Sequence, residues 1–589
     1  MSLTDWKDAD LEARFLGGLS IEAPWALVET FSTLTRESGS EDERKAARYI
    51  SDRLTEWGVP HQVFEPELYL SLPRTASLDL LKPTKQKMKA RPPAFSASTG
   101  KNGVRGQAVY VPTGFAARAD EIFRADVSGE VDLHGKIALM EGFPKRVLAA
   151  QQRGAIGCIF ISPGQNIHEG ICTQFWGTPD LDSIKDKPGI PVVCINKTNG
   201  EALIKACREG PVTARIRTEM EEGWKRCPLV VAEIRGAEVP EEFVLVHGHL
   251  DSWYVGVGDN AVGDATLLEL ARVFWQNRSR VRRTLRVAWW PAHSTGRYAG
   301  STWYADRHAV DLAENCVAQV NIDSPGCRWA TEYDGVMWMK EAEAFCQRAI
   351  ADATGKKATG ARPLRAGDYS FNNLGLTGFF MLLSTMPEEL RVSKGYHHVG
   401  GCGGNIAWHT PDDTLEIAEK DNLMRDLKVY TVALVRTLDA PVHPFDFTAV
   451  ADEFRGTLTR CQEQGAGRFD LTPGLQAAAA LRESLEDFYR RAEEWRTLPA
   501  GDPRVRRANA VQRRLARLLI PVNFVRTNRF RHEQSVSTPP LPDLAPIASL
   551  PHLDPASDGF RLTVAHLIRG QNRVVYALRR AREACESAR

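Results

Sequence analysis

A short stretch of the chain places histidine and aspartate side chains where they could bind a metal ion. His249 and Asp251 follow the apolar run Phe243 to Val246, and Asp259-Asn260 come shortly before a helical pattern from Gly263 to Trp275. The apolar run predicts a buried strand, so its carboxyl end would present His249 close to the helix start that carries Asp259. Imidazole and carboxylate groups are common ligands of divalent ions, and Asp251 could orient the ring of His249. The stretch therefore predicts a metal site at one edge of a sheet.

Further motifs along the chain resemble the M28 family of co-catalytic zinc exopeptidases in order and approximate spacing. After Asp259-Asn260 come a strand ending near His293-Ser294, then Asn321-Ile-Asp323, then His409 followed by Asp412-Asp413. More closely, nearly the whole chain is similar to the branch that contains glutamate carboxypeptidase II and the transferrin receptor. That resemblance implies an α/β fold, with a mixed sheet flanked by helices, an inserted protease-associated domain and a C-terminal helical domain.

The same resemblance implies a set of metal ligands. His249, Asp259 and Asp323 would hold one ion, and Asp259 would bridge to a second ion that His409 also holds. The four positions fall at the ends of predicted strands, where open α/β sheets place their ligands.

At one position the chain departs from the family pattern. The family has two consecutive glutamates after the next strand, the first a general base and the second a metal ligand. Here the strand from Leu285 to Trp290 is followed by His293 and Ser294, and the downstream glycines Gly296 and Gly300 indicate that register. Both carboxylates are therefore missing.

This replacement changes the expected charge balance of the site. Two divalent ions bring a charge of +4, which Asp259 and Asp323 alone would compensate poorly, and such an imbalance is costly in a partly dry site. We therefore expect a divalent metal, with zinc as the first choice. One ion at His249, Asp259 and Asp323 is favoured unless His293 becomes a ligand alongside His409.

The catalytic base also has to be reassigned. His293 has an unperturbed pKa of about 6.5 and could take up a proton near neutral pH, with Asp251 orienting His249. His397 and His398 are weaker alternatives that loop packing explains as well. Candidates for the substrate pocket, none of them counted as catalytic, are segment 365–371, Arg297, Tyr298, Trp253 and Tyr254.

These observations favour a metal-dependent hydrolase that cleaves an amide or peptide bond of a small or short peptide-like substrate through a metal-activated water. A lyase or unusual amidohydrolase that uses His293 as base or ligand is an alternative. A non-catalytic, receptor-like binding protein is a third, because the transferrin receptor branch contains a degenerate site. The retained ligand positions argue against it.

Composition narrows the class of protein further. The chain has 589 residues, 43% of them hydrophobic, and a formal net charge of +1, which predicts no nucleic-acid partner. The first residues have no basic and apolar leader pattern, and no run approaches the about 20 apolar residues that span a bilayer, so no membrane association is expected. Eleven cysteines without paired spacing favour reduced thiols and a cytoplasmic location.

The elements that must position the site divide into four segments. We predict a first part of the catalytic domain at 1–80, with a helix capped by Ser40 and Glu43 that stops at Gly58, and a protease-associated insertion at 81–226. The second part of the catalytic domain follows at 227–443. Helical patterns at 472–495, 504–520 and 561–584 fill a dimerisation-like domain at 444–589, which predicts a homodimer. An intramolecular cap on the catalytic domain is the alternative.

Overall fold

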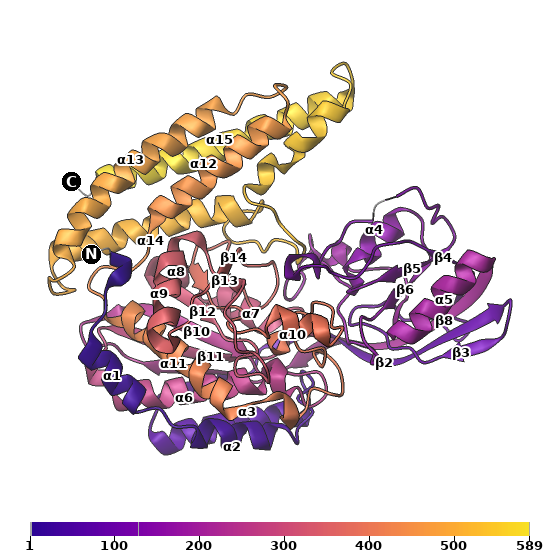
Figure 1. Cartoon of the computed structure of the whole chain (residues 1–589), viewed down its shortest axis with the longest axis horizontal. Coiled ribbons are helices and arrows are strands. Elements are labelled where there is room, and N and C mark those ends of the chain that lie inside the picture. The colour runs from indigo at the N-terminus through magenta and orange to yellow at the C-terminus, as the bar shows by residue number, and fades with distance from the viewer. Residues whose placement is uncertain (1–2, 128, 588–589) are drawn as a thin grey trace.

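The computed structural model describes residues 3–127 and 129–587, which form three units (Figure 1). A six-stranded mixed sheet with helices packed around it forms the largest unit. A seven-stranded sheet lies to one side of it, and a layer of long helices lies over it. The α/β architecture with an inserted unit and a helical C-terminal region matches the fold predicted from the sequence.

The six-stranded sheet brings the ends of three parallel strands to one edge. Its parallel part runs β11–β10–β12–β15, while β9 pairs antiparallel with β11 and with β1. Carboxyl ends of parallel strands lie at the same edge, so the residues after β10, β11 and β12 meet in space. The strands in spatial order are β1 (His61–Phe64), β9 (Leu229–Ile234), β11 (Arg283–Trp290), β10 (Val239–His249), β12 (Cys316–Asn321) and β15 (Thr377–Phe379).

Helices cover this sheet on both faces. The helices α6 (Val262–Gln276) and α11 (Lys420–Asp439) contact β10 and β11, and α3 (Glu41–Trp57) contacts β9. The helix α8 (Ala309–Asn315) contacts β10 and β12. Since both faces are covered, the strand core is apolar and fully buried, as at Val244 and Val246. The remaining elements of this unit are α1 (Ala9–Gly17), α2 (Glu22–Phe31), α7 (Ala299–Arg307), α9 (Glu343–Thr354), α10 (Glu388–Ser393), β13 (Val336–Met337) and β14 (Gly360–Ala361).

The start of α3 follows the predicted capping pattern. The hydroxyl of Ser40 accepts a hydrogen bond from the backbone N–H of Glu43, at 3.1 Å. The Glu43 carboxylate accepts from the N–H of Gly39 rather than from Ser40 itself. The helix stops at Gly58, which takes a left-handed conformation with φ of 72°.

The inserted unit is built on a seven-stranded sheet with the order β3–β2–β8–β4–β5–β6–β7. Two long antiparallel strands, β2 and β8, connect it to the larger unit. Its helices are α4 (Val147–Gln152) and α5 (Lys197–Glu209). The strands are β3 (Gln86–Met88), β2 (Glu67–Lys82), β8 (Val212–Arg226), β4 (Val104–Tyr110), β5 (Ile137–Glu141), β6 (Gly157–Ile161) and β7 (Val192–Ile195).

This topology corrects the first predicted boundary. The sequence predicts the start of the insertion at residue 81, but β2 begins at Glu67 and pairs with β8 along nearly its whole length. The apolar strand pattern before residue 80 gives no sign of which sheet it joins, because its antiparallel partner lies about 140 residues later in the chain. The insertion therefore begins between β1 and β2.

The C-terminal unit contains four long helices. The sequence predicts α13 (Thr472–Trp495), α14 (Pro503–Phe524) and α15 (Asp558–Glu586) to within a few residues, but not α12 (Phe447–Gln464). Pro542–His552 forms a 3₁₀ segment in front of α15. The helix α13 packs against both α12 and α15, and Arg517 of α14 donates hydrogen bonds to the backbone carbonyls of Ala313 in α8 and Cys316 at the start of β12. The helical layer is thus attached to the sheet through α14.

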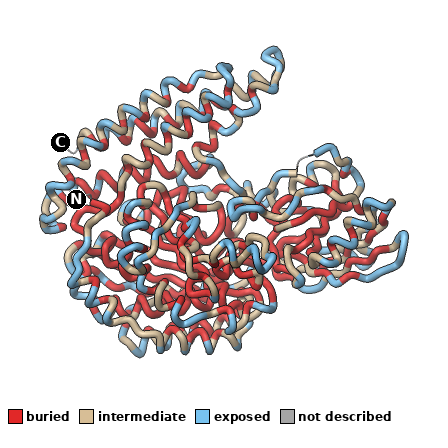
Figure 2. The backbone as a smooth tube through the Cα atoms, in the orientation of Figure 1, coloured by how far each residue is buried: buried red, intermediate tan, exposed pale blue. Residues whose placement is uncertain are grey.

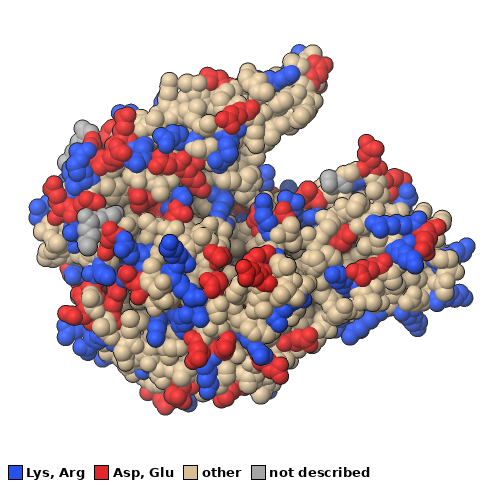
Figure 3. Space-filling model, in the orientation of Figure 1, with Lys and Arg blue, Asp and Glu red and all other residues tan. Residues whose placement is uncertain are grey.

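Burial and charge follow this arrangement. Buried residues concentrate in the two sheets and their covering helices, and exposed ones line the outer helices (Figure 2). Positive and negative side chains alternate over the visible face, in keeping with the net charge near zero (Figure 3). None of the helices in the described part of the chain has the length and apolar character needed to cross a bilayer.

Candidate metal centre

The candidate site is assembled at the carboxyl edge of the central sheet. In the strand register, His249 lies beside Trp290, and His247 lies beside Asn321. The chain then continues from these ends to Asp251, His293 and Asp323. All three are buried, because the loops that carry them fold back over the edge.

The buried carboxylate of Asp259 forms the centre of the site. Its Oδ1 atom lies 2.9 Å from Nε2 of His249, and its Oδ2 atom lies 3.1 Å from Nε2 of His409. An oxygen of Asp323 is 3.9 Å from the same nitrogen of His249. The structure therefore brings the four residues expected as metal ligands to one place, although they span 160 positions of the sequence.

The protonation of the imidazoles indicates a place for a cation. Nδ1 of His249 lies 2.8 Å from the backbone carbonyl of Asp251, and Nδ1 of His409 lies 2.8 Å from the carbonyl of Glu169. A carbonyl can only accept, so both Nδ1 atoms carry hydrogen. In the neutral rings both Nε2 lone pairs then face a carboxylate oxygen of Asp259. Two acceptors at this distance need a proton or a metal ion between them.

The role predicted for Asp251 needs a correction. Its carboxylate does not bond the ring of His249, whose Nδ1 is 3.9 Å from Oδ1, while its backbone carbonyl does. The carboxylate instead accepts hydrogen bonds from the N–H groups of His293 and Ser294 and from the hydroxyl of Ser38. The backbone of β10 ends so that the carbonyl, and not the side chain, faces the imidazole. Asp251 therefore holds the turn that carries His293.

His293 lies inside the site and is oriented by Asp368, which the sequence predicts only as part of the pocket segment 365–371. Its ring stacks on His249 with centroids 3.9 Å apart, and its Nδ1 lies 2.8 Å from Oδ2 of Asp368. Asp368 also accepts a hydrogen bond from the hydroxyl of Ser301 at 2.6 Å. One donor atom each of His249, His293 and Asp323 lie within 4.8 Å of one another. The Nε2 atom of His293 is thus free to take a proton or a metal ion.

The charges of these groups perturb one another strongly. Burial opposes protonation of His249, but its hydrogen bond with Asp259 and the charges of Asp259, Asp323 and Asp251 raise the pKa of His249 well above its usual value. Burial and then the charge of Asp259 raise the pKa of Asp323 to about 7. Burial, and then the charge of His249, lower the pKa of His293. Such mutual repulsion among buried carboxylates is relieved by a bound cation.

Two further buried carboxyl groups, those of Asp264 and Asp413, lie near the site. Burial raises the pKa of Asp413 to about 7, and its oxygens accept from the N–H groups of Gly258 and Asp259. Asp264 is also buried, and neither of its carboxylate oxygens has a hydrogen-bond partner among the described residues. Burial also raises the pKa of Asp264 well above its usual value, so neither Asp264 nor Asp413 adds a full negative charge at neutral pH, and the two do not make up the shortage of negative charge expected from the sequence.

The inserted unit contributes directly to the site, which sequence reasoning did not predict. Glu169 and His409 are joined by two hydrogen bonds, one from the N–H of Glu169 to the carbonyl of His409 and one from Nδ1 of His409 to the carbonyl of Glu169. The Glu169 carboxylate is held by Arg91 and by the hydroxyl of Tyr254. No local motif marks Glu169, because its contact with His409 is long-range.

A small cavity of about 40 Å³ opens onto these side chains. Arg297 and Tyr298, two of the sequence-based pocket candidates, line it, whereas Arg365 lines a different cavity. Trp253 lies beside His409, with ring centroids 6.0 Å apart. The cavity lining comes from both units and includes Asp259, His293, Asp323, His409, Phe123, Phe143, Ile171, Met337, Leu364 and Met381.

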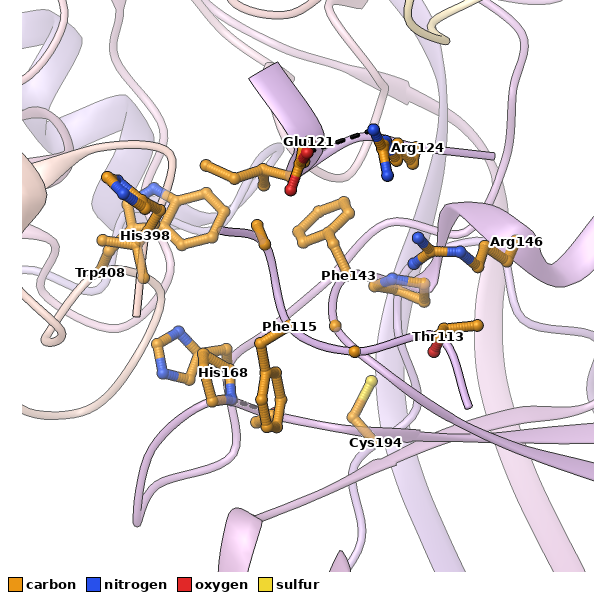
Figure 4. Close-up of a pocket in the computed structure, with 18 residues that line it drawn as sticks. Thr113, Phe115, Glu121, Arg124, Phe143, Arg146, His168, Cys194, His398 and Trp408 are labelled. Atoms are coloured by element: carbon orange, nitrogen blue, oxygen red, sulfur yellow. Dashed lines mark hydrogen bonds and ion pairs between the residues drawn. The ribbon is translucent and has the colours of Figure 1, made fainter. Parts of the chain in front are cut away.

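A neighbouring cavity between the two units adjoins it (Figure 4). His398 and Trp408 of the larger unit lie on one side, and Phe115, Phe143 and Arg146 of the insertion lie at the centre and on the other side. Residues that line both cavities are Ile122, Phe143, Val399 and Trp408. The loop with His397 and His398 thus belongs to this neighbouring cavity rather than to the metal ligands.

Comparisons with known proteins agree with this architecture. Residues 230–431 match Peptidase family M28, and residues 100–203 match the PA domain. A glutamate carboxypeptidase 2 homolog of Caenorhabditis briggsae is 25% identical over 381 residues, which are 49% of this chain and 49% of that protein. Carboxypeptidase Q of Bos taurus is 28% identical over 47% of this chain and 59% of its own length. The chain thus matches only about half of the length of these curated relatives.

Solved structures support the fold. The aminopeptidase from Aneurinibacillus sp. strain AM-1 has 21% identity and a TM-score of 0.53, over 72% of this chain and 96% of its own. A zinc aminopeptidase from Bacillus subtilis has 20% identity and the same TM-score, again over 72% and 96%. From the two matched segments, the chain carries a peptidase family M28 domain together with a PA domain, and it is similar to glutamate carboxypeptidase and carboxypeptidase Q relatives.

Proposed function

We propose that the protein is a divalent-metal-dependent hydrolase of amide or peptide bonds in small or short peptide-like substrates. The observation that carries the proposal is the arrangement around Asp259, where two imidazoles with fixed tautomers direct bare Nε2 atoms at one buried carboxylate. This donor set suits zinc, which accepts nitrogen and carboxylate ligands. The M28 domain agrees with it.

The residues that would hold the ion are His249, Asp259 and Asp323. When bound there, a divalent ion would polarise an amide carbonyl and lower the pKa of a water molecule. We propose a single tightly held ion, because the position of the family's second glutamate is Ser294, which adds no carboxylate to the side of Asp259 that faces His409. His409 then serves mainly to hold Asp259.

His293 is proposed as the group that moves protons. Asp368 accepts the Nδ1 hydrogen and fixes the ring, so that Nε2 faces the cavity where an amide would be cleaved. A positioned imidazole contributes typically about 10²- to 10⁴-fold to such reactions. In the alternative, His293 is itself a metal ligand. Removing its imidazole would then also remove the metal, so metal analysis of a His293 variant distinguishes the two roles.

The test combines metal analysis with a substrate panel. The purified chain is stripped with a chelator, reloaded with zinc, and assayed for hydrolysis of dipeptides and N-acyl amino acids, with detection of both the amine and the acid. We expect turnover that disappears with the metal and returns on reloading. Stoichiometric release of an unsaturated product instead of an acid would point to the lyase alternative. A purified chain that binds no metal would support the receptor-like one.

We also propose that the chain forms a homodimer through its C-terminal helices. Support comes from the amphipathic pattern of α12 to α15 and from three exposed apolar side chains on α15, at Leu562, Ile568 and Tyr576. Light scattering of the purified chain should give twice the mass of 65.4 kDa. Replacing Leu562 and Tyr576 with glutamate should yield the monomer, whereas a monomeric parent chain would contradict the proposal.

A cytoplasmic location likewise remains a proposal. All eleven cysteines lie in the described residues, are free, and are mostly buried, which suits a reducing compartment. Cell fractionation of the native host with an antibody against the chain would test this.

A further inference from the structure

The cavity that contains the proposed metal ligands is too small for a whole substrate. Its volume of about 40 Å³ is close to the share of one water molecule in the liquid, about 30 Å³. The neighbouring cavity beside His398 and Trp408 has about 60 Å³ and offers little more space. The bond to be cleaved can lie at this point, but the groups attached to it need room elsewhere.

A much larger cavity adjoins the site cavity. It has a volume of about 770 Å³, within the range of about 300–1,000 Å³ that is usual for small-molecule sites. Five residues line both this cavity and the site cavity, so the two spaces are neighbours. The shared residues are all apolar: Ala119, Met337, Leu364, Leu382 and Val399. A group that extends from the metal ligands into the larger cavity therefore crosses an apolar boundary.

The interior of the larger cavity is also mainly apolar. Leu383 and Met386 belong to its lining and are buried, and most of the surface that the lining presents is apolar. Pro539 and Pro540 of the C-terminal unit contribute a further apolar part of the lining. Burial of apolar surface is thus the interaction that this cavity offers to an occupant.

The charged side chains of the lining already have partners within the described residues. Asp120 and Glu388 form ion pairs, and Asp334 accepts a hydrogen bond from a threonine hydroxyl. The arginines of the lining are likewise paired with carboxylates or donate to backbone carbonyls: Arg124, Arg362, Arg365 and Arg391. Since these charges are compensated by the protein itself, none of them requires a charged ligand.

The part of the lining that comes from the C-terminal unit is held at both ends. Segment 537–540 lines the cavity. Before it, the N–H of Ser535 donates to the carbonyl of Gln174 at 2.7 Å, and the hydroxyl of Ser535 accepts from Nζ of Lys145 at 2.8 Å. After it, Leu541 is fully buried. Because both ends are fixed, the cavity has a defined depth and should limit the length of the group that it accepts.

We infer that the larger cavity binds a hydrocarbon group of the substrate, so that the preferred substrates are amides with a long apolar chain on one side of the cleaved bond, such as N-octanoyl amino acids. The inference rests on the proposed function for the bond that is cleaved, but the binding of the chain can be measured without turnover. The lining of the larger cavity is in this view a determinant of specificity and takes no part in proton transfer.

The first experiment uses substrates that differ only in the length of one hydrocarbon chain. N-acyl-alanines from acetyl to decanoyl, and alanine alkylamides of the same lengths, are assayed on the zinc-loaded full chain. In one of the two series kcat/KM should rise by about fourfold for each added methylene until the cavity is filled, and then level off. Flat or falling values in both series would overturn the inference. A preference for tripeptides over N-octanoyl-alanine would also overturn it, because the cavity would then accept a polar chain.

Tryptophan substitutions test where the chain lies. Ser537 is an exposed residue of the lining, so Ser537→Trp should fill part of the cavity without replacing a buried residue. The ratio of kcat/KM for octanoyl and acetyl substrates should then fall by about tenfold or more. Ser549→Trp is the matched control, since Ser549 is exposed in the same unit and outside the lining, and its ratio should equal that of the parent.

A second variant keeps this test decisive. If Ser537→Trp does not fold, Ala361→Phe places a ring into the same cavity from β14 and should lower the ratio in the same direction. An unchanged ratio in a folded variant of either kind would show that the chain binds elsewhere and would overturn the inference.

A binding measurement separates this inference from the proposed function. Ketone analogues, in which a methylene replaces the amide N–H, have no amide bond to cleave and are titrated calorimetrically into the zinc-loaded full chain. The octanoyl analogue should bind more tightly than the acetyl analogue, and Ser537→Trp should lose that difference. Binding that depends on chain length without hydrolysis of any amide would support the inference and refute the proposed function. Hydrolysis without a dependence on chain length in either measurement would do the reverse.

Discussion

The two oxygens of Asp259 face different surroundings, although they belong to one carboxylate. On the Oδ1 side, His249 is held by the backbone of its own unit, and Asp323 and Asp251 contribute negative charge. On the Oδ2 side, His409 is held by Glu169 of the PA domain, and the resemblance predicts Ser294 at the position of the family's second glutamate. On the Oδ1 side, several carboxylates lie close together and the imidazole is held by its own domain. On the Oδ2 side, fewer carboxylates are present and the imidazole is held by a contact between two domains.

Under the single-ion proposal, this difference explains why the ion would be held on the Oδ1 side of Asp259. A cation is attracted where carboxylates converge, so the Oδ1 side can hold an ion without help from the second. On the Oδ2 side, the imidazole of His409 also connects the PA domain to the site through its hydrogen bond with Glu169.

The largest effect is expected for His249→Ala. The substitution removes a donor on the Oδ1 side, so the chain should lose its metal and its activity should fall by more than about 10³-fold. Elemental analysis and turnover of the same preparation measure both. Retention of one full equivalent of metal would show that the ion lies elsewhere.

His293→Ala should lower kcat by roughly 10²- to 10⁴-fold while metal content stays unchanged, because the imidazole is proposed to carry a proton and not the ion. Far-UV circular dichroism provides the control for folding. If the metal is lost together with the activity, His293 is itself a metal ligand and belongs with His249 and Asp323 on the Oδ1 side.

His409→Ala should reduce activity less, by roughly 10- to 100-fold, the range found for groups that orient a metal ligand. Metal content should stay near one equivalent per chain, since the Oδ1 side is intact. A parent protein with two equivalents and a variant with one would contradict the single-ion proposal.

The smallest effect is expected at the domain contact. Glu169→Gln weakens the charge-assisted hydrogen bonds with Arg91 and Tyr254 that hold the loop behind His409, which should cost roughly 1 kcal/mol, or about fivefold in activity. Glu209→Gln is the matched control in the same domain, because its exposed ion pair with Lys205 contributes little. Equal activities of the two variants would show that the PA domain does not support the site.

Much of the site could be predicted from single positions and their order. His249, Asp259, Asp323 and His409 each follow a recognisable strand or turn, so the family pattern names them one by one. The role of Asp251 could not be predicted, because whether its carbonyl or its carboxylate faces His249 depends on the backbone direction at the end of β10. The sequence predicts Asp368 only as part of the pocket segment 365–371. Its hydrogen bond with His293 joins residues 75 positions apart, so no local pattern predicts it.

Local periodicity and residue type were enough to predict most of the helices and strands, and the family resemblance predicts the order of the ligands and the loss of the two glutamates. Only the tertiary structure decided which strand ends meet, where β2 pairs, that Glu169 supports His409, and that a large cavity adjoins the site. The physical reason is that burial and pairing depend on groups far away in the chain, and neither a charge nor a hydrogen-bonding atom reveals its partner before the chain has folded.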